Sequence, residues 1–172
     1  MAAYRLSAAG AGDALVAAGF VPFLVGQRGS PAALAALANA AASGDAGTTA
    51  VLDAGALRAL AGVECVSPAT EVRRCAFHLL ANVSAGGRPE AVLALLGGDI
   101  PAALVRGVCD PDPGVAEQAR EGLENVIVRA RHEFAWPLRA AGVERALRAQ
   151  RGELRTWAGR LLGHLYELFP PA

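Results

Sequence analysis

One short pattern recurs along this chain at nearly regular intervals, and it constrains the fold more than any other feature. Each copy has Ala six residues before a polar residue and Leu two residues before it. The polar residues are Asn39, Asn82, Asn125 and His164. The first three are 43 residues apart and the fourth follows after 39. Self-similarity at a period near 40 residues is typical of solenoids built from stacked helical units.

The clearest copy lies in the stretch from Glu71 to Gly86, which we predict to be one amphipathic helix. Its apolar residues Ala76, Phe77, Leu80 and Val83 are spaced by one, three and three positions, so they share one face. We therefore expect this face to be part of the core. Asn82 and His78, four residues apart, lie on a neighbouring face.

The composition supports an all-α fold. Apolar residues make up 53% of the 172 residues and charged residues 19%, which is enough to build a core and argues against disorder. Aromatic residues contribute only 5%. Ala, Leu and Val supply most of the apolar volume, and this favours closely packed helices over a sandwich or barrel.

Gly and Pro divide the chain into units of a short, a medium and a long helix. Gly19, Gly55 and Gly98 separate the first two helices of a unit, and Pro often lies in a first helical turn. We expect Pro137 to kink or end the helix that contains it. The expected helices cover 13–18, 21–25, 31–42, 48–54, 57–63, 71–85, 89–96, 100–109, 115–129, 132–140, 143–150 and 153–169.

The unit Gly-x-Val-Pro-x-Leu, seen at 19–24, followed by Ala-x-x-x-Leu-x-Asn, resembles the armadillo repeat. The resemblance implies a right-handed α-α superhelical solenoid of about three and a half to four three-helix repeats. HEAT repeats are the nearest alternative, but their two-helix units lack the short helix before Gly55 and Gly98. We expect a single domain over 1–172, with approximate repeats 1–18 (partial), 19–54, 55–97, 98–141 and 142–169.

The resemblance also implies a binding groove. In armadillo proteins the long third helices line a concave surface, where a ladder of Asn side chains holds the backbone of an extended peptide. A carboxamide both donates and accepts hydrogen bonds, so it can hold a peptide unit of any sequence. Carried over by position, the ladder is Asn39, Asn82 and Asn125, with His164 as the fourth rung. The alternative is that each Asn bonds to a neighbouring repeat.

Residues beside the ladder would set ligand preference. Four positions before the rungs stand Ala35, His78, Glu121 and Arg160. Importin-α-like proteins have Trp there, so the resemblance does not extend to nuclear-localisation-signal binding. Trp157, seven positions before His164, forms a candidate anchoring pocket with Arg160 and His164. Packing of Trp157 in the end of the solenoid is the alternative.

The sequence does not predict catalysis, a cofactor or a metal site. Cys75 and His78 lie three residues apart, but no third group to orient such a dyad is apparent. The cysteines Cys65, Cys75 and Cys109 are odd in number and form no CxxC pair. We therefore expect reduced thiols in a cytoplasmic and/or nuclear protein.

Charge is balanced overall but unevenly distributed. The net charge is zero, whereas residues 129–172 carry eight Arg against four acids. We expect a protein or extended-peptide partner, no membrane span and no nucleic acid; the sequence does not indicate an oligomeric state. Two alternatives stay open: an armadillo-type nucleotide-exchange factor of a chaperone, and nucleic-acid or membrane-surface binding through the basic third. The latter would use Arg145, Arg148, Arg151 and Arg155, although such a run is often only a solvated face.

Overall fold

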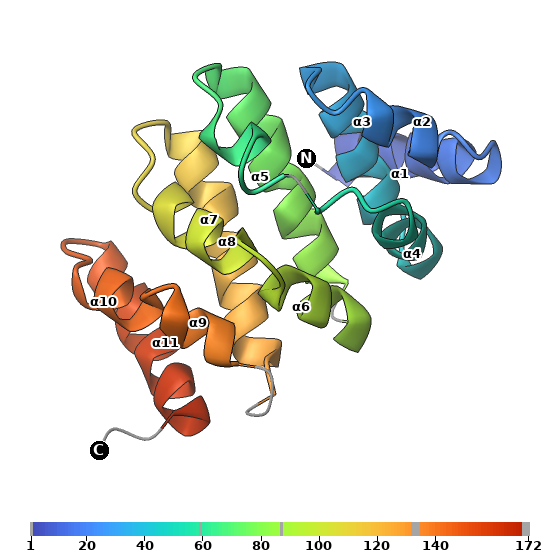
Figure 1. Ribbon diagram of the computed structural model, residues 1–172. Helices are drawn as coiled ribbons and strands as arrows, with labels where there is room; N and C mark the ends of the chain where they lie inside the picture. Colours follow the sequence, from blue (N-terminus) through green and yellow to red (C-terminus); the bar gives the residue numbers. More distant parts are fainter. Residues whose placement is uncertain (1, 59, 87, 132–134, 170–172) are drawn as a thin grey trace.

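The computed structural model describes residues 2–58, 60–86, 88–131 and 135–169. Within these ranges all regular structure is helical, and strands are absent (Figure 1). The long helices are α1 (Ala2–Ala17), α3 (Pro31–Ala42), α5 (Thr70–Ala85), α8 (Pro113–Arg129) and α11 (Leu154–Leu168). The shorter elements are α2 (Val21–Gly26), α4 (Asp45–Asp53), the 3-10 helix η1 (Glu64–Val66), α6 (Pro89–Leu96), α7 (Ile100–Gly107), α9 (Trp136–Ala140) and α10 (Val143–Arg148).

Helix α5 confirms the amphipathic pattern. The predicted face is buried, with Ala76 and Leu80 fully inaccessible and Phe77 only 1% exposed. Because this face continues around the helix through Leu79 and Val83, α5 packs between α3 on one side and α8 on the other. Burying a Phe or Leu side chain contributes about 1.5–3 kcal/mol. The apolar face therefore stabilises the fold more than any cap of this helix.

The long helices form a row in chain order. Helix α1 packs on α3, α3 on α5, α5 on α8 and α8 on α11. Figure 1 shows the chain advancing through these helices from blue to red, with the short elements placed beside them. One apolar cluster runs from Val21 to Leu165 through the whole stack. This is a solenoid: each unit buries its apolar face only against its neighbours.

The positions of Pro and Gly in the sequence predicted most helix boundaries correctly. Pro22, Pro31 and Pro101 all lie in the first turn of their helices, where an N–H would have no intrahelical partner. Gly55 and Gly98 follow α4 and α6 with φ of +72° and +54°, a region in which a side chain is strained. The α6 bounds match the predicted range, and α5 and α8 begin one and two residues early.

The expected helix at 57–63 is wrong. Residues 54–63, apart from Ala59, which lies outside the described residues, form turns that lead into η1. Gly55 and Gly62 leave too short a segment for a helix to stabilise itself. Tertiary contacts fix the turns instead: Leu60 is fully buried, and Arg28 Nε lies 3.2 Å from Oε1 of the buried Glu64.

Two further expectations need correction. The short helix at 13–18 is the end of α1, which is 16 residues long. Pro137 neither kinks nor ends a helix, because α9 begins at Trp136 and Pro137 lies in its first turn. The expected start at His132 falls on residues 132–134, which lie outside the described part of the chain. The repeat boundaries stay predictions.

None of the helices in the described ranges has the length and apolar content needed to cross a membrane.

Candidate functional site

The four residues of the predicted ladder lie on four successive long helices. Asn39 is on α3, Asn82 on α5, Asn125 on α8 and His164 on α11, and each is half-buried. The Ala and Leu residues of the same frame turn toward the core, which fixes the polar residue at the edge of the packed face. The repeated frame therefore repeats one position in space, once per unit.

Two of the rungs are tied to the preceding long helix. Nδ2 of Asn82 donates to the Ala38 carbonyl at 2.9 Å, and Nδ2 of Asn125 donates to Ser84 Oγ at 3.0 Å. The alternative interpretation, bonding between repeats, thus applies to both side chains. A carboxamide has a second N–H and an acceptor oxygen as well. Neither group has a hydrogen-bond partner elsewhere in the described part of the chain, and both side chains are only partly buried.

Ser84 is a site residue that sequence reasoning missed. It is buried, its hydroxyl donates to the Ala81 carbonyl at 2.6 Å, and that same Oγ accepts from Asn125. Arg129, at the end of α8, donates to the Ser84 carbonyl at 2.7 Å. These bonds satisfy polar groups in the last turn of α5, where backbone carbonyls have no intrahelical partner. Two side chains of α8, Asn125 and Arg129, therefore bond to Ser84 of α5.

Three of the four positions one turn before the rungs are exposed. His78, Glu121 and Arg160 all reach solvent, and Ala35 is half-buried. The row thus runs from an apolar residue at the N-terminal end to charged ones at the C-terminal end. Arg160 is not isolated, since its Nη2 lies 2.6 Å from Glu124 Oε1.

Glu124 is the second residue that the sequence did not single out. Its Oε2 accepts from Trp157 Nε1 at 2.9 Å while its Oε1 pairs with Arg160. One carboxylate on α8 thus holds two side chains of α11. The predicted pocket is therefore only partly assembled: Trp157 and Arg160 meet at Glu124, whereas His164 Nδ1 lies 3.5 Å from Glu167 on its own helix. Trp157 also packs partly buried against the core.

The Cys75–His78 pair is poorly suited to nucleophilic chemistry. Burial, followed by the nearby charge of Glu71, raises the pKa of Cys75 above its usual value. A nucleophilic thiol needs the opposite shift, because the thiolate is the reactive form. The described residues contain no group of three or more His, Cys, Asp or Glu that could hold a metal ion.

The basic cluster of the C-terminal third is partly neutralised. Arg148 bonds to Glu144 at 2.9 Å and also contacts the Tyr166 hydroxyl. Arg151 donates to two backbone carbonyls, and Arg145 and Arg155 are exposed. Among the described residues of this cluster, only Arg148 is paired with an acid, so phosphate binding and a solvated face both stay predictions.

Comparison with known proteins gives structural relatives only. No family model matches the chain, and no curated protein matches it. An engineered protein from the Northeast Structural Genomics Consortium superposes with a TM-score of 0.80 at 27% identity over 91% of this chain. A designed armadillo repeat protein superposes with a TM-score of 0.76 at 27% identity over 88% of it. The chain has an armadillo-like repeat fold.

Two more designed armadillo structures also superpose on this chain. A computationally designed armadillo repeat protein for modular peptide recognition aligns with a TM-score of 0.76 at 26% identity over 87% of this chain. A designed armadillo repeat protein in complex with the peptide (KR)4 aligns at 24% identity with a TM-score of 0.75, which supports the fold alone. The present chain spans 66% of the length of each of these two and of the engineered protein above.

Proposed function

We propose that this armadillo-like domain is a non-enzymatic interaction module that binds an extended peptide along its row of long helices. The observation that carries the proposal is the recurrence of a partly buried carboxamide at one position of three successive long helices. Asn82 and Asn125 each keep an acceptor oxygen and a second N–H beyond the bond to the preceding long helix, and the Asn39 side chain has no such bond among the described residues. Such groups suit a peptide main chain, which presents one donor and one acceptor per residue.

The structural relatives support a peptide rather than a small substrate. One of them is a designed protein for modular peptide recognition, and its fold matches this chain over most of its length. On this proposal the rungs hold the main chain, and His78, Glu121 and Arg160 select side chains by charge. The free thiols suggest a cytoplasmic or nuclear location, where the domain would act as an adaptor.

The test begins with a peptide selected for binding to the folded domain from a random display library. Asn82→Ala and Asn125→Ala should each weaken that peptide by about 0.5–1.5 kcal/mol, and peptides of unrelated sequence by a similar amount. Glu121→Arg should instead change the preferred sequence, weakening basic ligands and sparing acidic ones. Arg155→Ala, on an exposed face away from the rungs, is the control.

The decisive titration uses the Asn82→Ala/Asn125→Ala double variant after circular dichroism has shown its helices intact. Unchanged affinity would remove the ladder as the site and direct attention to α11, around Trp157 and Phe169. The alternative of nucleic-acid or membrane-surface binding has a separate signature: affinity for DNA or anionic vesicles that falls steeply with salt. Stimulated nucleotide release from a chaperone would support the exchange-factor alternative.

A further inference from the structure

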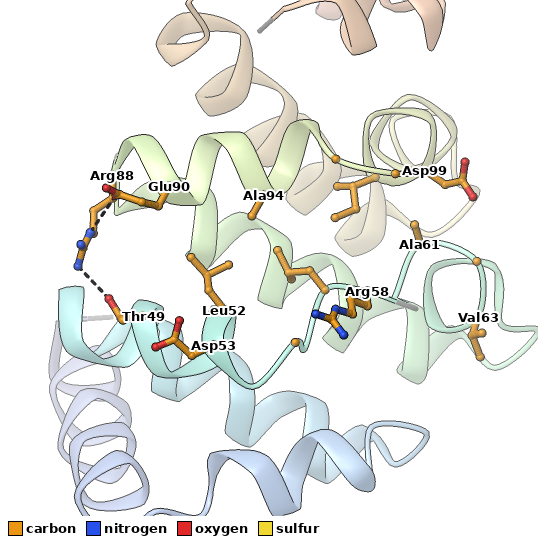
Figure 2. A pocket seen from close by; sticks show the side chains of 16 residues that line it. Thr49, Leu52, Asp53, Arg58, Ala61, Val63, Arg88, Glu90, Ala94 and Asp99 are labelled. Atoms are coloured by element: carbon orange, nitrogen blue, oxygen red, sulfur yellow. Dashed lines mark hydrogen bonds and ion pairs between the residues drawn. The ribbon is translucent and has the colours of Figure 1, made fainter.

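A cleft of about 740 Å³ opens on the side of the short helices. Its apolar walls include Leu52 of α4, Leu57 of the following turns, Ala94 of α6 and Ile100 of α7. None of its lining residues belongs to α3, α5, α8 or α11 (Figure 2). The cleft is therefore separate from the row of rungs, and the proposed peptide site does not use it.

The irregular residues 54–58 and 60–63 create this space. Turns stand here in place of the second helix of a regular unit. Gly62 and Gly98 line the cleft and contribute no side chain to it. A Cβ at either glycine would meet nothing within 4 Å. Leu52 and Ala94 lie on opposite sides of the opening in Figure 2. The hollow thus arises from the chain's own departure from helical geometry.

Arg58 is the cation of this cleft. Its side chain is exposed and folds back over Gly55, and it has no hydrogen-bond or ion-pair partner among the described residues. Figure 2 shows its guanidinium turned toward the middle of the cleft. Arg88, at the other end, is already held: it donates to Thr49 Oγ1 at 2.8 Å and lies 3.5 Å from Glu90. Among the described residues that line the cleft, Arg58 alone is a cation available to an anion.

We propose that this cleft binds a small amphipathic carboxylate, with its apolar tail between Leu52, Ala94 and Ile100 and its carboxylate on Arg58. The volume is within the range of ordinary small-molecule sites, which are largely apolar with a few polar groups. A guanidinium fork matches a carboxylate in geometry and charge. The acids Asp53, Glu90 and Asp99 also line the cleft and repel an anion, so the carboxylate of the ligand is favoured at Arg58.

The test uses sodium decanoate, below its micelle concentration, as the probe of the full chain. Amide resonances of 49–63 and 88–100 should shift saturably in a two-dimensional NMR titration. Arg58→Gln should weaken binding about tenfold, because it removes a charge-assisted pair, whereas Arg155→Gln should leave it unchanged. Decanol and decylammonium should bind more weakly than decanoate.

A second pair of variants tests the cavity itself. Ala94→Met narrows the cleft and should reduce decanoate affinity, whereas Leu93→Met, on the exposed side of the same helix, should not. Equal binding of decanoate and decylammonium, or an Arg58→Gln titration that matches wild type, overturns the proposal. Absence of saturable shifts does so as well. Loss of peptide affinity in the rung variants with decanoate binding retained separates this site from the proposed function.

Discussion

The ring of Phe77 lies directly against the backbone of Gly107. A Cβ placed on residue 107 would come within 2.5 Å of Phe77 Cζ and 2.7 Å of the Ala119 Cβ. Helix α7 can therefore approach α5 and α8 only because residue 107 has no side chain. This contact fixes how one unit packs inside the stack.

The first prediction concerns this close approach. Gly to Ala inside a helix normally gains about 1 kcal/mol in propensity, but Gly107→Ala should lose about 1–3 kcal/mol through overpacking. Phe77→Ala should lose about 3–5 kcal/mol as a core truncation. Urea unfolding of Phe77→Leu, Gly107→Ala and the double variant should show a combined loss smaller than the sum, since Leu leaves room for the methyl. Strict additivity would contradict the contact.

The second prediction concerns pH. The guanidinium of Arg74, with Nε 2.8 Å from Oδ1, and then the backbone N–H of Val115 lower the pKa of Asp112 to about 2. Since an unfolded Asp titrates near pH 3.9, the stabilisation is complete above that value and disappears as pH falls toward about 2. Asp112→Asn keeps a residue that can cap α8 and removes only the charge.

Thermal unfolding from pH 7 to pH 2 gives the measurement. Asp112→Asn should be less stable than wild type at neutral pH, and the two melting temperatures should converge at the acid end. Asp45→Asn, an exposed acid in the first turn of α4, serves as the control. A difference that stays constant across this range would show that the charge of Asp112 does not stabilise the fold.

The third prediction concerns the carboxylate that joins α8 to α11. Glu124→Ala should release the Trp157 indole and cost about 1 kcal/mol, a modest value because the paired Arg160 is exposed. In a Trp136→Phe background, Trp157 is the only tryptophan, and its emission should shift to the red. Glu121→Ala, one turn earlier and exposed, should leave the spectrum as it was. An unchanged spectrum in Glu124→Ala would mean that packing alone holds Trp157.

The fourth prediction concerns the thiols. Burial, then the charge of Glu64, raises the pKa of Cys65 to about 12, and burial also raises the pKa of Cys75. Cys109 is exposed, so iodoacetamide should label it first and Cys65 only on unfolding. Mass spectrometry of native and urea-treated protein gives the order. Changing all three should leave peptide binding intact; selective loss with Cys75→Ser in a folded protein would revive an enzymatic role.

Sequence reasoning could predict the parts of the fold that local patterns determine. The Ala and Leu positions of the frame are buried in α3, α5 and α8 because a long helix with one apolar stripe has only one face to bury. The turns at 57–58 and 60–63 were not predicted, because their conformation depends on partners far along the chain. The Glu64 carboxylate meets Arg28, and the Ala61 carbonyl accepts from Arg106 at 3.4 Å.

The candidate site divides in the same way. The repeat pattern placed Asn39, Asn82 and Asn125 on successive long helices, because a repeated sequence position is a repeated spatial position. Glu124 and Ser84 carry no such pattern. An acid beside a rung is either solvated or bonded to the next helix, depending on how two units stack. The sequence pattern does not predict this stacking.

The polar ties between long helices have a mechanical consequence. Asn82 joins α5 to α3 with a neutral amide-to-carbonyl bond, and Asn125 joins α8 to α5 with a neutral amide-to-hydroxyl bond. Glu124 of α8 forms an ion pair with Arg160 of α11 on a partly exposed surface. Salt screens charges and leaves neutral bonds largely unaffected. Rising ionic strength should therefore weaken the Glu124–Arg160 pair and the Arg74–Asp112 pair that joins α5 to the start of α8, while the Asn82 and Asn125 bonds persist.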